Sequence, residues 1–373
     1  MKNSRITKET SLSKLLHKLV ITRKASDVEL KYLLGLDVHE DLTQLFDAAR
    51  NVRKRHFDNR VFLYGFLYFS TYCRNNCNFC QYRKSNTNIS RYRKNEEEIL
   101  IAARDMVESG VHLIDLTMGE DPELYYSGEL GFKRLVRLAT LIKKDTDLPV
   151  MISPGILPDS VISDLGQCGM DWYACYQETH NRQLYQRLRT GQDYDERMGK
   201  KLLAKKEGLL IEEGILVGVG ESLEDIVHSI RVMEKLDADQ VRVMSFVPQP
   251  GTPMENINKT PQNILRELLT IAVMRLVLQD RLIPASLDVD GLAGLKVRLD
   301  AGANVITSIV PPGKGLAGVA NHSLDIEEER RTRQSVLPIL KSCNLTVAGA
   351  LEYSEWIQSR RLSYVNKANR TCF

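Results

Sequence analysis

The spacing of apolar residues along this chain changes at about residue 60. Before that point polar residues predominate, and the apolar ones recur at the helical period. We expect one helix to start at Ser26-Asp27 and a second to run from about Asp41. From Val61 to Phe69 the sequence VFLYGFLYF is almost continuously apolar, which is typical of a strand that is buried on both faces.

Seven further apolar runs follow, and stretches with helical spacing separate them. The expected strands are 61–69, 112–118, 150–153, 171–176, 215–219, 240–247, 283–288 and 304–310. The expected helices cover 95–109, 131–145, 158–166, 194–208, 222–236, 261–281 and 291–301. Strand followed by helix, repeated over roughly 250 residues, predicts an α/β fold of the (β/α)8 TIM-barrel type. A doubly wound open sheet is the alternative, although no GxGxxG motif follows a strand.

The flanking segments add to this barrel at both ends of the chain. We expect the barrel to occupy residues 61–310 and the N-terminal helices of residues 1–60 to pack on it. Residues 311–373 would form a C-terminal extension with helices around 326–341 and 346–360. The final stretch, RRLSYVNKANRTCF, is predicted to be a basic and poorly packed tail.

Composition narrows the classes of protein to consider. The chain has 373 residues, with 51 Lys and Arg against 48 Asp and Glu, and this balance argues against a strongly basic nucleic-acid-binding protein. No run of about 18 apolar residues occurs, and the N-terminus lacks the apolar stretch of a secretory signal. We therefore expect a cytoplasmic protein without a membrane or nucleic-acid partner, in which a disulfide framework is improbable.

Three of the seven cysteines lie within eight residues, directly after the first expected barrel strand. Cys73, Cys77 and Cys80 have the spacing C-x3-C-x2-C, on a loop that would face the active site of a barrel. Three thiolates suit three irons of a [4Fe-4S] cluster and leave the fourth iron open. A zinc site is the weaker alternative, because zinc needs a fourth ligand. Scattered core or surface thiols are expected at Cys168, Cys175, Cys343 and Cys372.

This cysteine motif, with Phe79 before its last cysteine, resembles the signature of radical S-adenosylmethionine (SAM) enzymes. The resemblance implies that the open iron binds the amino and carboxylate groups of SAM, with Phe79 beside the cofactor. One electron from an external reductant would then cleave SAM to a 5′-deoxyadenosyl radical. The resemblance runs from about residue 26 to 350 and is closest to the group containing biotin synthase and the FeFe-hydrogenase maturase.

Two short stretches after the second and third strands are similar to SAM-binding segments of that family. Thr117-Met118-Gly119-Glu120 resembles a Gly-Gly-Glu loop in which Met118 replaces the first glycine, so Gly119 and Glu120 would hold the SAM amino group. Ser153 has the position of a ribose-binding residue. Without the resemblance, Glu120 reads as a loop acid and Ser153 as a helix cap.

Two later stretches extend the similarity to SAM-binding segments. Gln177-Glu178-Thr179 and LYQRLRTGQDYDER are similar to the maturase, which implies that Glu178 contacts the ribose hydroxyls and Arg197 the SAM carboxylate. Ile215–Glu221 is similar to the strand beside the adenine, where glycines permit close approach. As bare residues, Glu178 and Arg197 read equally well as surface charges.

Strand alternation suggests a separate polar set inside the barrel. Arg242 on the sixth strand would bind a substrate carboxylate, while Ser286 and Asp288 on the seventh strand, together with Asp121, would bind ammonium groups. That set suits a doubly charged, lysine-like substrate. The alternative is that these side chains face outward or pair with one another.

Within the group, four stretches look most like the lysine mutases that make 3-methylornithine, the first step of pyrrolysine biosynthesis: VFLYGFLYFSTYCRNNCNFCQYR, LTMGEDPELYY, PQPGTPM and SLDVDGL. The resemblance implies hydrogen abstraction from L-lysine, fragmentation to a glycyl radical and an aminobutene, and recombination. The sequence has no further cysteine grouping suited to a second cluster, so sulfur insertion is disfavoured. A related radical SAM maturase, another amino-acid radical enzyme, or an iron–sulfur or zinc protein with a sensing role are the alternatives.

Overall fold

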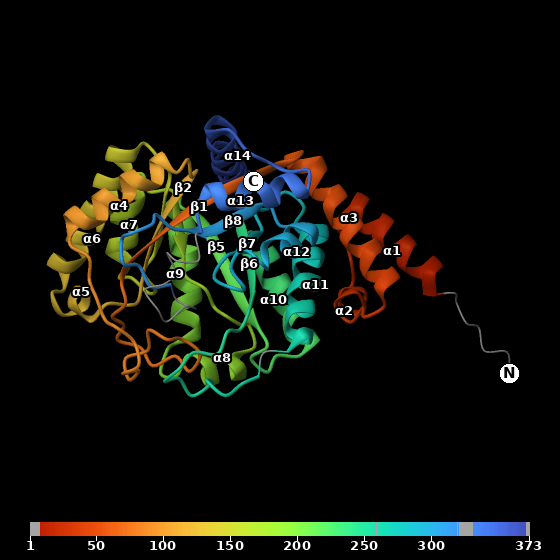
Figure 1. The fold of residues 1–373 in the computed structure, drawn as a ribbon, viewed down its shortest axis with the longest axis horizontal. Coiled ribbons are helices and arrows are strands. Elements are labelled where there is room, and N and C mark those ends of the chain that lie inside the picture. Colours follow the sequence, from red (N-terminus) through yellow and green to blue (C-terminus); the bar gives the residue numbers. More distant parts are fainter. Residues whose placement is uncertain (1–7, 259, 319, 321–330, 371–373) are drawn as a thin grey trace.

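Eight parallel strands form the centre of the computed structural model, which describes residues 8–258, 260–318, 320 and 331–370. The strands follow one another in the order β6-β5-β4-β3-β2-β1-β8-β7, and helices surround them (Figure 1). Their bounds are β1 Arg60–Ser70, β2 Leu113–Met118, β3 Val150–Ser153, β4 Trp172–Ala174, β5 Leu210–Val217, β6 Gln240–Ser245, β7 Pro284–Ser286 and β8 Val305–Ile309. The predicted (β/α)8 barrel is confirmed.

The barrel closes at only one of its two ends. Between β6 and β7 a single bridge joins Gln240 to Leu282. The amide of Val241 donates to the carbonyl of Leu282 over 3.0 Å, and the amide of Leu282 donates to the carbonyl of Asp239 over 3.1 Å. All four residues lie at the amino-terminal ends of the strands. The carboxyl-terminal ends of β6 and β7 therefore diverge, which leaves space for a cavity at that edge.

The helices mostly follow the predicted order. Their bounds are α1 Lys8–Thr22, α2 Asp27–Leu34, α3 His39–Phe57, α4 Glu96–Glu108, α5 Pro122–Tyr126, α6 Glu129–Thr146, α7 Asp159–Gln167, α8 Arg182–Leu188, α9 Tyr194–Lys206, α10 Leu223–Leu236, α11 Pro261–Val277, α12 Leu295–Asp300, α13 Arg333–Ser342 and α14 Ala350–Arg370. The predicted helix start at Ser26-Asp27 is confirmed, because the Ser26 hydroxyl accepts the amide of Glu29 in a capping box. The short helices α5 and α8 were not predicted. The first part of the predicted helix 326–341 lies outside the described residues.

The predicted bounds of the fifth strand were wrong. The apolar pattern placed this strand at 215–219, but β5 begins at Leu210. Glu212 and Glu213 interrupt the apolar pattern there, and both are fully buried in the structure. Charged side chains are rarely buried unless they are paired. Two adjacent glutamates therefore made the first half of this central strand look exposed in the sequence.

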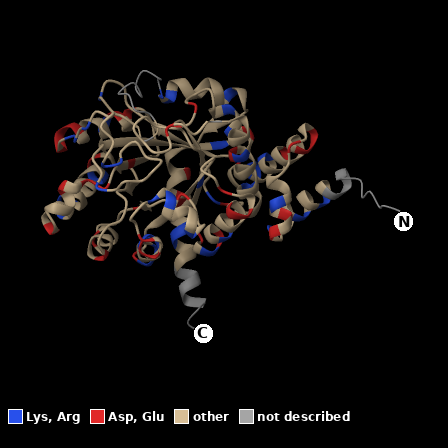
Figure 2. Cartoon of the chain, turned by 90° about the horizontal axis from the view of Figure 1, so that it is seen from below, with Lys and Arg blue, Asp and Glu red and all other residues tan. Residues whose placement is uncertain are grey.

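Helices from the two chain termini cover different parts of the barrel. α1, α2 and α3 pack along α10 and α11 at one side (Figure 1). Both signs of charge alternate over the outer helices (Figure 2). Among the described residues, no helix is both long and apolar enough to cross a bilayer.

The prediction of a poorly packed tail was wrong as far as residue 364, because Arg360 forms an ion pair with the buried Asp239 over 2.7 Å and Tyr364 packs against the core. The predicted helix 346–360 is present from Ala350 as part of α14, and only its first residues differ, since Thr346–Val347 form a short strand, β9, which pairs with β1. α14 lies across the amino-terminal end of the barrel, where its Tyr353, Trp356 and Ile357 join an aromatic cluster with strand residues. Trp356 stacks on Trp172 of β4 with ring centroids 5.9 Å apart. The amino-terminal end of the barrel is therefore plugged.

Candidate functional site

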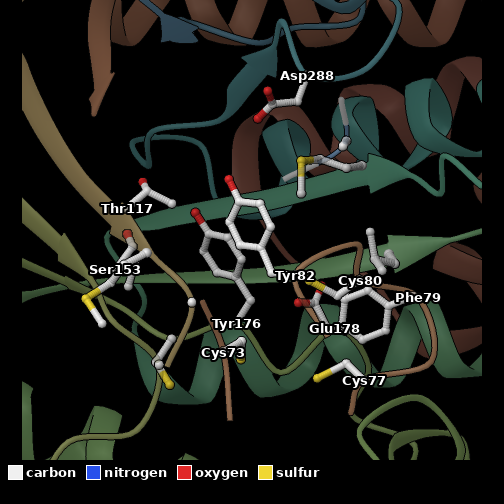
Figure 3. Close-up of a pocket in the computed structure, with 18 of the residues that line it drawn as sticks. Cys73, Cys77, Phe79, Cys80, Tyr82, Thr117, Ser153, Tyr176, Glu178 and Asp288 are labelled. Atoms are coloured by element: carbon white, nitrogen blue, oxygen red, sulfur yellow. The ribbon is translucent and has the colours of Figure 1, made fainter. Parts of the chain in front are cut away.

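A cavity at the open, carboxyl-terminal end of the barrel brings the three clustered cysteines together. Cys73, Cys77 and Cys80 all line it, on the loop that follows β1 (Figure 3). Cys77 is buried, and the other two are half-buried. Burial raises the pKa of the Cys73 thiol to about 11, and burial also raises the pKa of the Cys80 thiol. A metal that binds here must displace these protons.

Two chain segments hold the cysteine loop in place. The amide of Arg74 donates to the carbonyl of Glu120 over 2.8 Å, and the amide of Asn78 donates to the carbonyl of Leu188 over 2.8 Å. Leu188 is the last residue of α8, so this helix, which was not predicted, supports the cysteine loop. Phe79 also lines the cavity and packs with Leu216 and neighbouring apolar side chains.

Glu120 lies in a tight pocket in the wall of the cavity. Its carboxylate accepts the amide of Ile156 over 3.1 Å and the guanidinium of Arg74 over 2.9 Å. Arg197 lies 3.5 Å away. Burial alone would raise the pKa of Glu120, but Arg197, the Ile156 amide and Arg74 outweigh it and hold the pKa below its usual value. Glu120 is therefore an ionised, buried carboxylate and not a loop acid on the surface.

Two glycines make room for this arrangement. A Cβ on Gly119 would lie 2.3 Å from the carbonyl oxygen of Tyr72, so the chains could not approach this closely with any other residue. Gly155 has φ +80° and a Cβ there would lie 2.3 Å from Glu120. The turn after β3 thus needs glycine both for its conformation and for the space that Glu120 fills.

Glu178 and Arg197 both line the cavity, and neither is a surface charge. Glu178 has φ +67°, an uncommon conformation that its bonds to β5 maintain: its amide donates to Gly214 and its carbonyl accepts from Leu216. Arg189 donates to the Glu178 carboxylate over 2.6 Å. Burial still raises the pKa of Glu178, since it outweighs the guanidinium.

Ser153 is bonded to an acid that the sequence analysis did not select. The Ser153 hydroxyl donates to Oδ1 of Asp115 on β2 over 2.7 Å, and Ser153 does not cap a helix. Asp115 is fully buried and lines the cavity. Burial raises its pKa to about 7, more than the Ser153 hydroxyl lowers it. The signal in the sequence was a single acid inside an apolar strand.

Arg242 lies opposite Asp115 inside the barrel, and its donors are only partly used. Its Nε donates to Glu212 over 2.6 Å and its Nη1 donates to Thr307 over 3.1 Å. Its Nη2 is buried without a hydrogen-bond partner in the structure, and Oδ2 of Asp115 is likewise unbonded. Both residues line the cavity. Thr117 Oγ1 on β2 is a further unbonded polar atom of the cavity. The barrel interior therefore offers an open donor on a guanidinium and an open acceptor on a carboxylate, where a buried polar atom normally finds a partner.

The remaining candidates differ in where they lie. Asp288 lines the cavity on the side away from Cys77 (Figure 3) and accepts bonds from Tyr68, Ser308 and Arg331. Ser286 is buried behind it, and its hydroxyl accepts the Asp288 amide over 3.2 Å. The structure does not bring Asp121 to this cavity. Its carboxylate is held by Arg93 over 2.6 and 2.8 Å and by Ser70.

Comparisons with known proteins agree with this geometry. Residues 67–233 match the model of the radical SAM superfamily. The chain is 43% identical to 3-methylornithine synthase of Methanosarcina barkeri over 336 residues, which is 90% of this chain and 94% of the relative. The chain belongs to the radical SAM superfamily. It is also 31% identical to the [FeFe] hydrogenase maturase subunit HydE of Thermotoga maritima, over 70% of this chain and 74% of that protein.

A solved structure supports the same family assignment. The crystal structure of methylornithine synthase (PylB) superposes with a TM-score of 0.85 at 43% identity, covering 92% of this chain and 99% of that chain. Radical SAM enzymes use a [4Fe-4S] cluster and SAM, so the predictions of the family and of both cofactors are confirmed. The residues fit these groups: three thiols line one cavity, and the cavity also carries a buried carboxylate and a buried guanidinium for a zwitterionic head group.

Several residues in or beside the radical SAM site were not predicted from the sequence. Cys175, treated as a scattered thiol, lines the cavity. Arg189 links the cysteine loop to Glu178, but it follows a helix whose seven residues were too short to stand out. Asp115 and Glu212 lie inside strands, where only a tertiary contact explains a charged residue.

Proposed function

We propose that this chain is a 3-methylornithine synthase, a radical SAM mutase that isomerises L-lysine. The similarity to relatives of that name supports the proposal. The observation that carries it is a charged donor and a charged acceptor in the cavity that both lack partners, Nη2 of Arg242 and Oδ2 of Asp115. A donor on a cation and an acceptor on an acid are what the carboxylate and ammonium of an α-amino acid require.

Lysine carries a second ammonium group at the far end of its side chain. Asp288 lies across the cavity from Thr117 and Ser153 (Figure 3), so it suits this second cation. In the proposed binding mode Arg242 holds the substrate carboxylate, Asp115 the α-ammonium and Asp288 the side-chain ammonium. Asp115 takes the role that the sequence analysis gave to Asp121, while Ser286 supports Asp288 from behind.

Each of the cofactor-binding residues suits a different group of the SAM molecule. Glu120 suits its amino group, Arg197 its carboxylate, and Glu178 its ribose hydroxyls. The Ser153 oxygen remains free to accept a bond from the ribose, because its hydrogen is donated to Asp115. When bound, the cluster and SAM supply the 5′-deoxyadenosyl radical that starts the reaction.

The adenine has an apolar slot of its own. Phe79, Leu216 and Phe246 pack together at the edge of the cavity. The carboxylate of Glu221 accepts the amides of Gly218 and Val219 over 2.9 to 3.0 Å and so fixes the loop beside this slot. In this proposal the protein holds and orients SAM and lysine and excludes water, while the cofactors supply the radical chemistry. The external reductant and the cytoplasmic location stay predictions.

A product assay tests the proposed substrate. Protein reconstituted anaerobically with iron and sulfide would be incubated with L-lysine, SAM and dithionite, and the products separated by mass spectrometry. We expect a compound with the mass of lysine and the retention of synthetic 3-methylornithine. If SAM is cleaved with an intact cluster but no such product forms, the substrate assignment is wrong. A Cys77→Ala variant, which loses a cluster ligand, is the negative control.

A further inference from the structure

Gln192 lies beside the cluster ligand Cys77, in the turn between α8 and α9. Its Nε2 is 3.0 Å from Sγ of Cys77. A side-chain amide has two hydrogens at one end and an oxygen at the other, so the meaning of this contact depends on which end faces the sulfur.

Two arginines settle the orientation of the Gln192 amide. Nη1 of Arg189 and Nη1 of Arg197 each lie 3.4 Å from Oε1 of Gln192. A guanidinium has only donors, so the amide oxygen must face both arginines. Both guanidiniums are themselves held by the carbonyl of Tyr176, over 3.0 and 2.8 Å. The NH2 group of Gln192 is therefore directed at the sulfur of Cys77.

A second donor approaches the same sulfur. Nη1 of Arg189 lies 3.7 Å from Sγ of Cys77, and its Nη2 is bonded to Glu178. Cys77 is also the most buried of the three cluster cysteines, at 6% exposure. A hydrogen bond at a buried sulfur is less screened by water than one at the protein surface.

We propose that Gln192, aided by Arg189, raises the reduction potential of the cluster by donating a hydrogen bond to the Cys77 thiolate. An added electron increases the negative charge on the cluster and its sulfur ligands, and a donor stabilises that charge more in the reduced state than in the oxidised state. Gln192 is thus a positioning residue for the radical SAM reaction. The inference rests on the family's cluster and is independent of the substrate.

The test is a potentiometric titration of the reconstituted full chain, followed by electron paramagnetic resonance without SAM or lysine. Gln192→Met keeps the size of the side chain and removes the donor. We expect a more negative midpoint potential than in the wild type, at the same iron content per chain. Gln186→Met, on the exposed side of α8, is the matched control and should leave the midpoint unchanged. A Gln192→Met midpoint equal to or more positive than that of the wild type overturns the proposal.

Gln192→Glu covers the case in which the methionine variant fails to assemble its cluster. The carboxylate still accepts from both arginines but has no hydrogen to donate, and it adds a negative charge beside the cluster, so both changes should make its midpoint more negative than that of the wild type. An unchanged or more positive midpoint overturns the proposal.

The wild type provides a readout that needs no variant. With glutamine labelled by 15N in its side chain, pulsed resonance of the reduced cluster should detect a coupled nitrogen, and absence of the coupling overturns the proposal. An iron-free wild type would instead contradict the cluster assignment. A failed methylornithine assay would contradict only the substrate.

Discussion

The two faces of strand β5 carry adjacent glutamates with opposite uses. Successive residues of a strand point to opposite sides, so Glu212 faces the barrel interior and Glu213 faces α9. Both are fully buried. Glu213 accepts the amides of Gln177 and Gly214 over 2.8 and 2.9 Å, and it forms an ion pair with Lys201. Glu212 forms an ion pair with Arg242 over 2.6 Å.

The difference lies in what each pair leaves open. Lys201 also donates to the side chain of Gln177 over 2.9 Å, so the outer pair fastens the segment that leads into Glu178. In the inner pair, one nitrogen of Arg242 has no partner. A buried charge is costly unless its hydrogen bonds are made, so the inner pair gains its last bond only from a ligand. The outer pair serves the fold, and the inner pair serves binding.

The largest expected effect is loss of stability from the outer pair. Lys201→Met leaves the Glu213 carboxylate buried without its cation, which costs about 3–5 kcal/mol of unfolding free energy. Lysine turnover per folded molecule should remain within a few-fold. Lys200→Met is the matched control, because its partner Asp159 is 75% exposed and such a pair contributes about 0–1 kcal/mol. Urea denaturation measures the stability of both variants. Equal unfolding midpoints for Lys201→Met and Lys200→Met would contradict the distinction between buried and exposed pairs.

Next in size is an effect on catalysis from the inner pair. Arg242→Lys keeps the charge beside Glu212 but loses the planar donor that faces the cavity. We expect kcat/KM for lysine to fall roughly 10²- to 10³-fold, equivalent to about 3–4 kcal/mol. Arg298→Lys is the control, because Arg298 is equally buried on Glu267 but outside the cavity. It should lower stability and spare kcat/KM. The reverse outcome would contradict the binding role of Arg242.

The same contrast explains what the sequence could and could not predict. Repeating apolar strands and helices predicted the barrel, because burial of apolar area dominates folding. The cysteine spacing predicted the cluster loop, because local ligands need no tertiary information. Glu212 and Glu213 broke the apolar pattern, so the start of β5 was missed. Their partners, Arg242 and Lys201, are distant in sequence, and only the folded chain shows how they pair.

The candidate site divides in the same way. Glu120 and Glu178 follow barrel strands, Ser153 ends β3 and Arg197 lies in α9, and the structure brings all four to one cavity. Asp121 comes directly after Glu120, but it turns away to cap α5. The position of a residue after a strand predicts that it lies at the open end of the barrel. The direction of its side chain depends on helix caps and on partners distant in sequence, which a single sequence does not show.

A smaller effect is expected from pH, through Asp115. Its pKa is raised by burial from 3.8 to about 7, and an ammonium group binds only its ionised form. Ser153 and Arg242 lower that pKa, and Glu212 raises it. We expect kcat/KM for lysine to fall up to about tenfold per pH unit below pH 7. In Asp115→Asn this dependence of kcat/KM on pH should vanish, and kcat/KM should be low at every pH.

The free energy of unfolding depends on pH in the opposite direction to kcat/KM. Between pH 4 and 7 the folded chain keeps a proton on Asp115 that the unfolded chain has lost, because the folded pKa is the higher one. Raising the pH through this window therefore lowers the contribution of Asp115 to the free energy of unfolding. For activity, a fall in kcat/KM below pH 7 that persists in Asp115→Asn would show that another group titrates.

The smallest effect is expected at the plugged end of the barrel, far from the radical SAM cavity. The hydroxyls of Tyr64 on β1 and Tyr353 on α14 lie 2.7 Å apart, and both side chains are buried. Tyr353→Phe removes this bond while keeping the ring, so the free energy of unfolding should fall by about 1–2 kcal/mol. Thermal unfolding measures the loss, and kcat/KM should not change. A fall in kcat/KM at unchanged stability would show that α14 acts on the cavity, and the division between a structural end and a chemical end of the barrel would fail.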